Sequence, residues 1–187
     1  MIKQCLLIAP VLNGSLSILS IVVAILIKQD STFLIINPVM TLALISCCSI
    51  FGGTLGACLS MTLFQNCDLS LLIRLQTLGL PLLFISLYTH WIFGVYLSLG
   101  MLMIVSGMLN PKFQALLMNS FPEERLALLM SGIMTLFQIG TFICRGIVAV
   151  LIVWLLVDWI SLSFLLISIL LTLYTFKTLQ RVNSSPY

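Results

Sequence analysis

The chain has 187 residues, of which 61% are hydrophobic and only 7% are charged. A soluble domain carries about 25% charged residues, so this composition excludes a water-soluble globular protein as well as a disordered chain, and it predicts an integral membrane protein. The net charge of +3 and the absence of any basic run exclude a nucleic-acid-binding protein.

Six segments are long and apolar enough to cross the roughly 30 Å of hydrocarbon in a bilayer, for which a helix needs about 20 residues. We predict spans at residues 5–27, 34–64, 71–89, 91–109, 126–157 and 160–176, within a single transmembrane domain that covers residues 1–187. The apolar runs are continuous rather than alternating, and this pattern favours helices over strands. The predicted fold class is therefore all-α, a six-transmembrane-helix bundle.

The basic residues predict how this bundle is oriented. With the N-terminus inside, only Lys28 falls in an outer loop, and Arg145 lies within a span. The basic residues of the inner segments are then Lys3, Arg74, Lys112, Arg125, Lys177 and Arg181. Because positive charge collects on the cytoplasmic side, we expect a multi-pass protein of the cell membrane with both termini in the cytoplasm.

The second span carries a line of small residues, Gly52, Gly56 and Ser60, at intervals of four. This spacing puts all three on one helix face, where small side chains let two helices approach closely. The pattern predicts a helix-packing contact, either within the chain, which is favoured, or between two chains. Asn37 and Pro38, earlier in the same segment, are typical of a helix start or a kink.

The fifth span carries a polar stripe of Ser131, Thr135, Gln138, Thr141 and Arg145, spaced so that all five share one face. An intramembrane charge costs about 2.5–3.5 kcal/mol on insertion scales and usually faces a bundle interior or a water-filled cavity. The stripe therefore suggests a cavity-lining face. In the alternative interpretation, Arg145 extends to the membrane interface and the hydroxyls bond to their own backbone.

Catalytic and metal-binding patterns are missing from the sequence. The six cysteines form no metal-binding spacing, and His90 is the only histidine, so we expect no metal, no cofactor and no enzyme activity. No acidic residue lies deep in a predicted span, whereas a proton-driven carrier normally needs an intramembrane carboxylate or histidine. Isolated amides in or beside spans, such as Asn13 and Asn110, can line a pathway or bond to a neighbouring helix.

Several motifs follow one another along the chain: Gly52, Gly53 and Gly56, then Asn110, Phe113–Leu117, Phe121–Arg125, Ser131–Gly132 and Gln138–Gly140. Their order resembles the C-terminal half, helices seven to twelve, of the major facilitator superfamily, and in particular its macrolide-efflux-like and drug-efflux-like carriers. In this resemblance the second span is similar to the eighth helix of the family, and Asn13 stands where the seventh often carries an asparagine. The loop that follows the eighth helix in the family is reduced here to residues 65–68.

The resemblance implies membrane transport by a secondary-active efflux carrier of small molecules. Such carriers rock two six-helix halves about a central site, so we expect a truncated carrier, or one that works with an N-terminal six-helix half or as a homodimer in the lipid bilayer. Its candidate substrate-cavity residues are Arg145, Gln138, Asn110, Thr141 and Asn13. The alternative function is a non-transporting accessory or immunity-type subunit that binds a partner in the bilayer.

Overall fold

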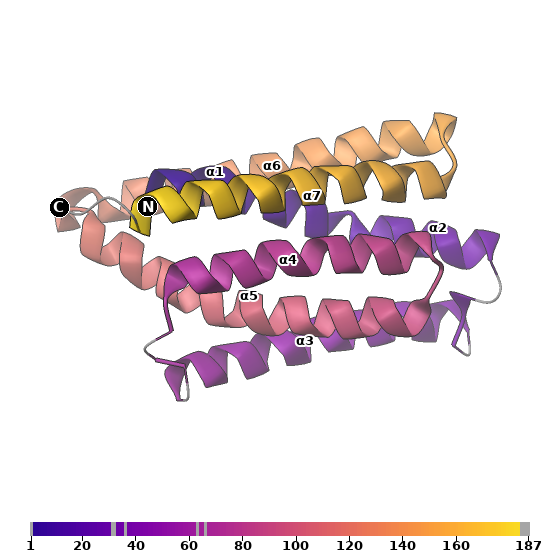
Figure 1. Ribbon diagram of the computed structural model, residues 1–187, viewed down its shortest axis with the longest axis horizontal. Helices are drawn as coiled ribbons and strands as arrows, with labels where there is room; N and C mark the ends of the chain where they lie inside the picture. Colours follow the sequence, from indigo (N-terminus) through magenta and orange to yellow (C-terminus); the bar gives the residue numbers. More distant parts are fainter. Residues whose placement is uncertain (1, 31–32, 36, 63, 66, 184–187) are drawn as a thin grey trace.

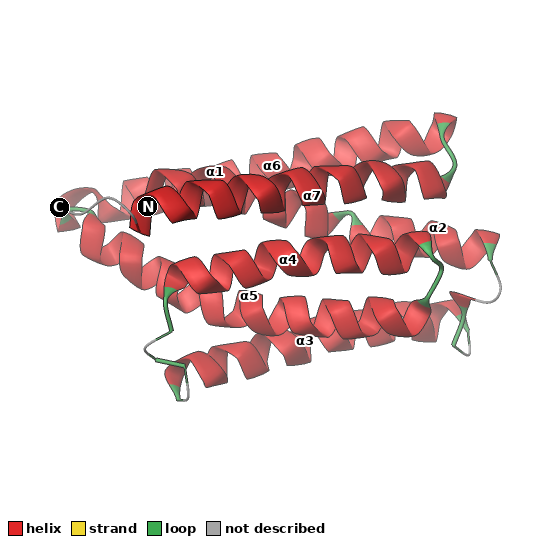
Figure 2. Cartoon of the chain, viewed as in Figure 1, coloured by secondary structure: helices red, strands yellow, loops and turns green. Residues whose placement is uncertain are grey.

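The structure of the protein is a computed structural model that describes residues 2–30, 33–35, 37–62, 64–65 and 67–183 (Figure 1). The described residues form helices joined by short turns and loops, without strands (Figure 2). The helices are α1 (Ile2–Ser17), α2 (Leu19–Gln29), α3 (Pro38–Met61), α4 (Leu69–Tyr88), α5 (Ile92–Ser120), α6 (Leu126–Trp154) and α7 (Val157–Asn183), with the 3-10 turn η2 (Glu123–Arg125) before α6.

Six helical stretches of the described chain are long and apolar enough to cross a membrane, and α1 and α2 together supply the first of them. The prediction of an all-α chain with six helices of membrane-spanning length is therefore confirmed. The six stretches are Leu6–Gln29, Pro38–Met61, Leu69–Tyr88, Ile92–Ser120, Leu126–Trp154 and Val157–Thr178.

Most helix bounds differ from the predicted spans by a few residues, and α7 runs from Val157 to Asn183 where residues 160–176 were predicted. The first span is interrupted at Ile18, between α1 and α2. The second begins at Pro38 rather than at residue 34, because Asn37 caps the helix. The fourth continues through Pro111 to Ser120, across most of the loop expected after residue 109. The buried side chains of Phe113 and Leu117 explain this extension, since they pack in the core as a continuation of α5.

The cap at the start of α3 gives a simple test of this local structure. The Asn37 side chain accepts a hydrogen bond of 2.7 Å from the backbone N–H of Met40. We expect Asn37→Ala to lower the free energy of unfolding by about 1 kcal/mol, the usual cost of a lost helix cap. Asn37→Asp, which keeps the acceptor oxygen, should leave it almost unchanged. Denaturant unfolding of the protein in detergent would measure both.

Helix α3 packs against α5 through glycines on both helices. A Cβ atom on Gly52 would lie 3.2 Å from the carbonyl oxygen of Gly100, and a Cβ atom on Gly56 would collide with the backbone of Ile104. Gly52, Gly56 and Ser60 are all buried. The small-residue line of the sequence therefore lies in a contact within the chain.

The other helices are arranged around this pair. Helix α4 packs against α5 and α7, while α6 packs mainly against α1, with Gly140 beside Pro10 and Gly14 beside Cys144. Of the described α6 side chains, only Ile133 and Val148 are buried, so most of this helix faces outward. The beginning of α1 and the end of α7 lie at the same end of the bundle (Figure 1).

At this end of the bundle, Lys112 of α5 binds the connection between α3 and α4. Its Nζ atom donates to the carbonyl oxygens of Phe64 and Cys67, each at 2.6 Å, and of Gln65 at 3.1 Å. The amine thus satisfies three carbonyl groups and holds the connection against α5.

Candidate functional site

A small recess lies between α1, α4, α5 and α6. Its volume is about 40 Å³, which is room for one or two water molecules. The rings of Phe113 and Phe137 stack at its edge with centroids 6.1 Å apart. Its lining residues are Ile8, Ala9, Leu12, Asn13, Ile73, Gln76, Ser106, Leu109, Asn110, Phe113 and Phe137.

Gln76 of α4 is the most deeply buried amide of this lining. The residue is 4% exposed, and its Oε1 atom is buried without a hydrogen-bond partner among the described residues. Leaving a buried acceptor unpaired costs about 1–3 kcal/mol. Gln76 therefore places an unsatisfied acceptor in the wall of the recess.

Two open grooves adjoin the recess and share residues with it. One groove of about 400 Å³ runs between α3 and α5, and the other, of about 480 Å³, runs between α1, α5 and α6. Ser106 lines all three, Asn110 lines the recess and the first groove, and Asn13 lines the recess and the second. Both volumes lie in the range of small-molecule sites, roughly 300–1,000 Å³.

The structure brings four of the five predicted cavity residues together. Asn13, Asn110, Gln138 and Thr141 line the recess or its grooves. Arg145, one turn beyond Thr141 on α6, is exposed and is not among the lining residues of these three spaces. The Thr141 hydroxyl donates to the carbonyl oxygen of Phe137 at 3.1 Å, which is the backbone bonding that the alternative interpretation of the stripe expects for its hydroxyls.

Sequence reasoning missed Gln76 and Ser106. Gln76 lies in an apolar stretch of α4, and its type and position were a usable signal, because an uncharged amide inside a span needs a polar neighbour. Ser106 gave no signal, since a single serine in a membrane helix usually bonds to its own backbone.

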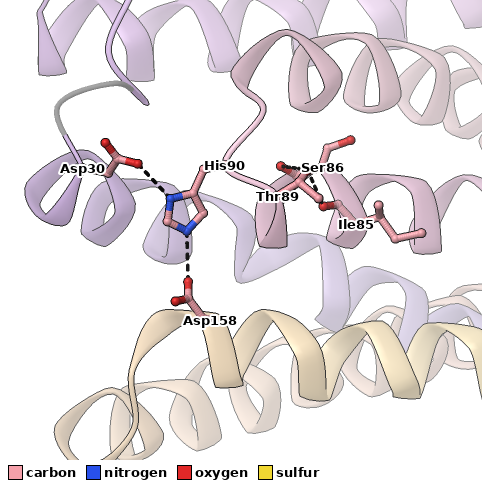
Figure 3. Close-up of polar contacts among 6 residues, drawn as sticks. All are labelled: Asp30, Ile85, Ser86, Thr89, His90 and Asp158. Atoms are coloured by element: carbon pink, nitrogen blue, oxygen red, sulfur yellow. Dashed lines mark hydrogen bonds and ion pairs between the residues drawn. The ribbon is translucent and has the colours of Figure 1, made fainter.

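A second polar group lies at the opposite end of the bundle from the start of α1, where His90 stands between two carboxylates (Figure 3). His90 Nδ1 is 2.8 Å from Asp30 Oδ2, and His90 Nε2 is 3.0 Å from Asp158 Oδ1. The sequence analysis did not bring these three residues together, because they come from parts of the chain that are far apart in the sequence.

The two carboxylates change the titration of the imidazole. Hydrogen bonds to Asp158 and then to Asp30 raise the pKa of His90 from its ordinary value of 6.5, against a smaller opposing effect of burial. The imidazole therefore keeps its positive charge to a higher pH than a free histidine does.

The recess and grooves offer neutral chemistry for binding. Amides, three hydroxyl side chains and two stacked phenyl rings surround them, and their lining contains no charged side chain among the described residues. Such a surface suits an uncharged or weakly polar molecule with an aromatic or aliphatic body and a few hydrogen-bonding groups.

The chain matches no protein-family model, and no curated protein and no solved structure matches it.

Proposed function

We propose that the chain forms one six-helix half of a secondary-active efflux carrier of small molecules, in which the recess and grooves form one wall of the substrate path. The observation that carries this proposal is the group of amides around them. Asn13, Asn110 and Gln138 are exposed although each lies within a membrane-spanning helix. Polar groups that face lipid are costly, so an aqueous path or a second protein surface is the environment that suits them.

The interruption of the first span supports the same function. Helix α1 ends at Ser17, and Leu16 and Ser17 line the larger groove together with Asn13. Secondary carriers commonly build their substrate sites beside broken helices, where irregular backbone lines a cavity. The broken helix and the polar groove therefore coincide, as the proposed wall requires.

The exposure of α6 supports a second half. Besides Gln138, this helix exposes Ser131, Thr135 and Arg145. Arg145 forms no ion pair with a described residue. In the proposed carrier, this face meets the second half, which is a six-helix body of different sequence or a second copy of this chain. In the proposed carrier, the end that carries Lys112 and Arg125 faces the cytoplasm, which is the orientation that the positive-inside rule favours.

The mass of the assembly extracted in mild detergent tests this arrangement. We expect native mass spectrometry to give a defined complex heavier than the 20.7 kDa of one chain. Arg145→Leu should weaken this assembly by about tenfold, equivalent to about 1.4 kcal/mol, because it removes the exposed charge on the contact face. Arg125→Gln, at the start of α6, is the matched control and should leave the mass unchanged.

Efflux of a neutral dye, Nile red, from cells that produce the intact assembly would then test transport directly. A complex that exports the dye supports the carrier. A complex with a protein that is not a six-helix carrier half, and no export, would support the accessory-subunit alternative instead. Arg145→Leu chains that assemble and export normally would show that Arg145 serves neither role.

A further inference from the structure

His90 joins three parts of the fold that are far apart in the sequence. It lies in the turn between α4 and α5, while Asp30 is the C-cap of α2 and Asp158 lies in the first turn of α7. Figure 3 shows the ring between the two carboxylates, with one nitrogen directed at each. The three residues thus connect the ends of α2 and α7 through one side chain.

The two contacts require a specific protonation state. A neutral imidazole has one N–H donor and one nitrogen lone pair, whereas an ionised carboxylate can only accept hydrogen bonds. With neutral His90, one of the two short contacts would oppose a nitrogen lone pair to a carboxylate oxygen. Only the imidazolium form donates to both Asp30 and Asp158, so the observed geometry is that of the proton-bound side chain.

The backbone holds the ring in this place. His90 has a φ of 54°, in the left-handed region that residues other than glycine seldom adopt. The turn is fixed by hydrogen bonds from the N–H of His90 to the Leu87 carbonyl and from the N–H of Trp91 to the Ser86 carbonyl. The ring of Phe33, which is fully buried, contacts the imidazole edge-on.

The charges around the imidazole ring favour a proton, rather than a metal ion, as its ligand. Asp30 and Asp158 are the charged groups that contact it among the described residues. The helix ends that meet here carry two other titratable residues, Lys28 on α2 and Tyr88 on α4. Neither of them has a described bond to the imidazole. The first turn of α5 carries no titratable residue. The two carboxylates bind opposite ring nitrogens, so they cannot share one metal ion with the ring.

We propose that His90 is a proton-binding site whose protonated form clamps the ends of α2 and α7 to the α4–α5 turn, and whose deprotonation opens this end of the bundle. Protons can reach it, because the side chains of His90, Asp30 and Asp158 are 32%, 26% and 51% exposed. The clamp does not depend on the carrier function. Its use as the site of proton coupling does rest on that proposed function.

The direction of the pH effect follows from the raised pKa of His90. The clamp contributes its full stability below pH 6.5, where the histidine is protonated in the folded and the unfolded chain alike. This contribution is lost as the pH rises through the higher pKa of the folded state. Raising the pH should therefore open the clamp, and lowering it should close it.

Because His90 is the only histidine, NMR of protein labelled at histidine and held in lipid nanodiscs reports its titration without ambiguity. We expect a pKa above 6.5 in the wild-type protein and a lower pKa in Asp30→Asn and in Asp158→Asn. Asp68→Asn is the matched control, since Asp68 precedes α4 at the other end of that helix. An unshifted His90 pKa, or one unchanged by both aspartate substitutions, would overturn the proton site.

Hydrogen exchange followed by mass spectrometry tests the clamp itself. After correction for intrinsic rates, peptides that cover residues 24–30 and 155–160 should lose protection between pH 5.5 and pH 8.5. His90→Asn should remove this pH dependence, because asparagine tolerates a positive φ but does not titrate. Equal protection at both pH values in the wild-type protein would overturn the clamp. Both measurements use the isolated chain, so their results do not depend on whether the assembly exports the dye.

Discussion

Gly56→Ala is expected to separate α3 from α5 and to lower the free energy of unfolding by about 3 kcal/mol, the upper part of the usual range for overpacking. The added Cβ would collide with the carbonyl oxygen of Ile104 and would lie 2.9 Å from its carbonyl carbon and 3.0 Å from Gly107 Cα. These are backbone atoms, which cannot rotate away as a flexible side chain can. Unfolding in detergent, followed by circular dichroism, would measure the loss.

Gly53→Ala is the matched control in the same helix. A Cβ atom at Gly53 would have no neighbour within 4 Å among the described residues, and alanine favours a helix over glycine by about 0.5–1 kcal/mol. This variant should therefore be as stable as the wild-type protein or slightly more stable. If Gly53→Ala and Gly56→Ala were equally tolerated, α3 and α5 would not be in the close contact described here.

Gln76→Leu is expected to increase the stability of the protein. Leucine removes the buried, unpartnered Oε1 atom, which should raise the free energy of unfolding by about 1–2 kcal/mol. Denaturant unfolding in detergent would measure the change.

The next residue supplies the comparison for Gln76. Thr77 is fully buried, and its hydroxyl donates to the carbonyl oxygen of Arg74 at 3.0 Å. Thr77→Val removes a satisfied hydrogen bond and should destabilise the protein by about 1 kcal/mol. Should Gln76→Leu destabilise the protein as much as Thr77→Val does, the Gln76 Oε1 atom would not be an unpaired acceptor in the folded protein.

The sequence predicted the helical class and the number of spanning helices because both depend on local composition. Asn37 and Pro38 likewise predicted a local event, the start of α3. The extension of α5 past Pro111 was not predictable in this way. Proline argues against a helix interior, and the buried positions of Phe113 and Leu117 that favour the helix depend on packing with other segments.

The polar groups also differ in whether the sequence alone reveals them or whether they depend on packing. The amides that line the grooves were visible as isolated polar residues in apolar stretches, since Asn13, Asn110 and Gln138 interrupt such stretches. The Asp30–His90–Asp158 group was not visible, because these residues are far apart in the sequence and meet only after the helices have packed. Lys112 was counted as a loop charge for orientation, and the structure gives it a second role as donor to the α3–α4 connection.

The packing of α1 on α6 also determines when the bundle can be completed during synthesis. The α1 surface around Pro10 and Gly14 rests on Gly140 and Cys144 of α6, and α2 to α5 are made between the two helices. The α3–α5 contact can form much earlier, because only α4 separates its partners. A nascent chain therefore inserts its first helix long before the partner of that helix leaves the ribosome. The recess and the groove beside α1 take shape only when the fifth spanning helix arrives.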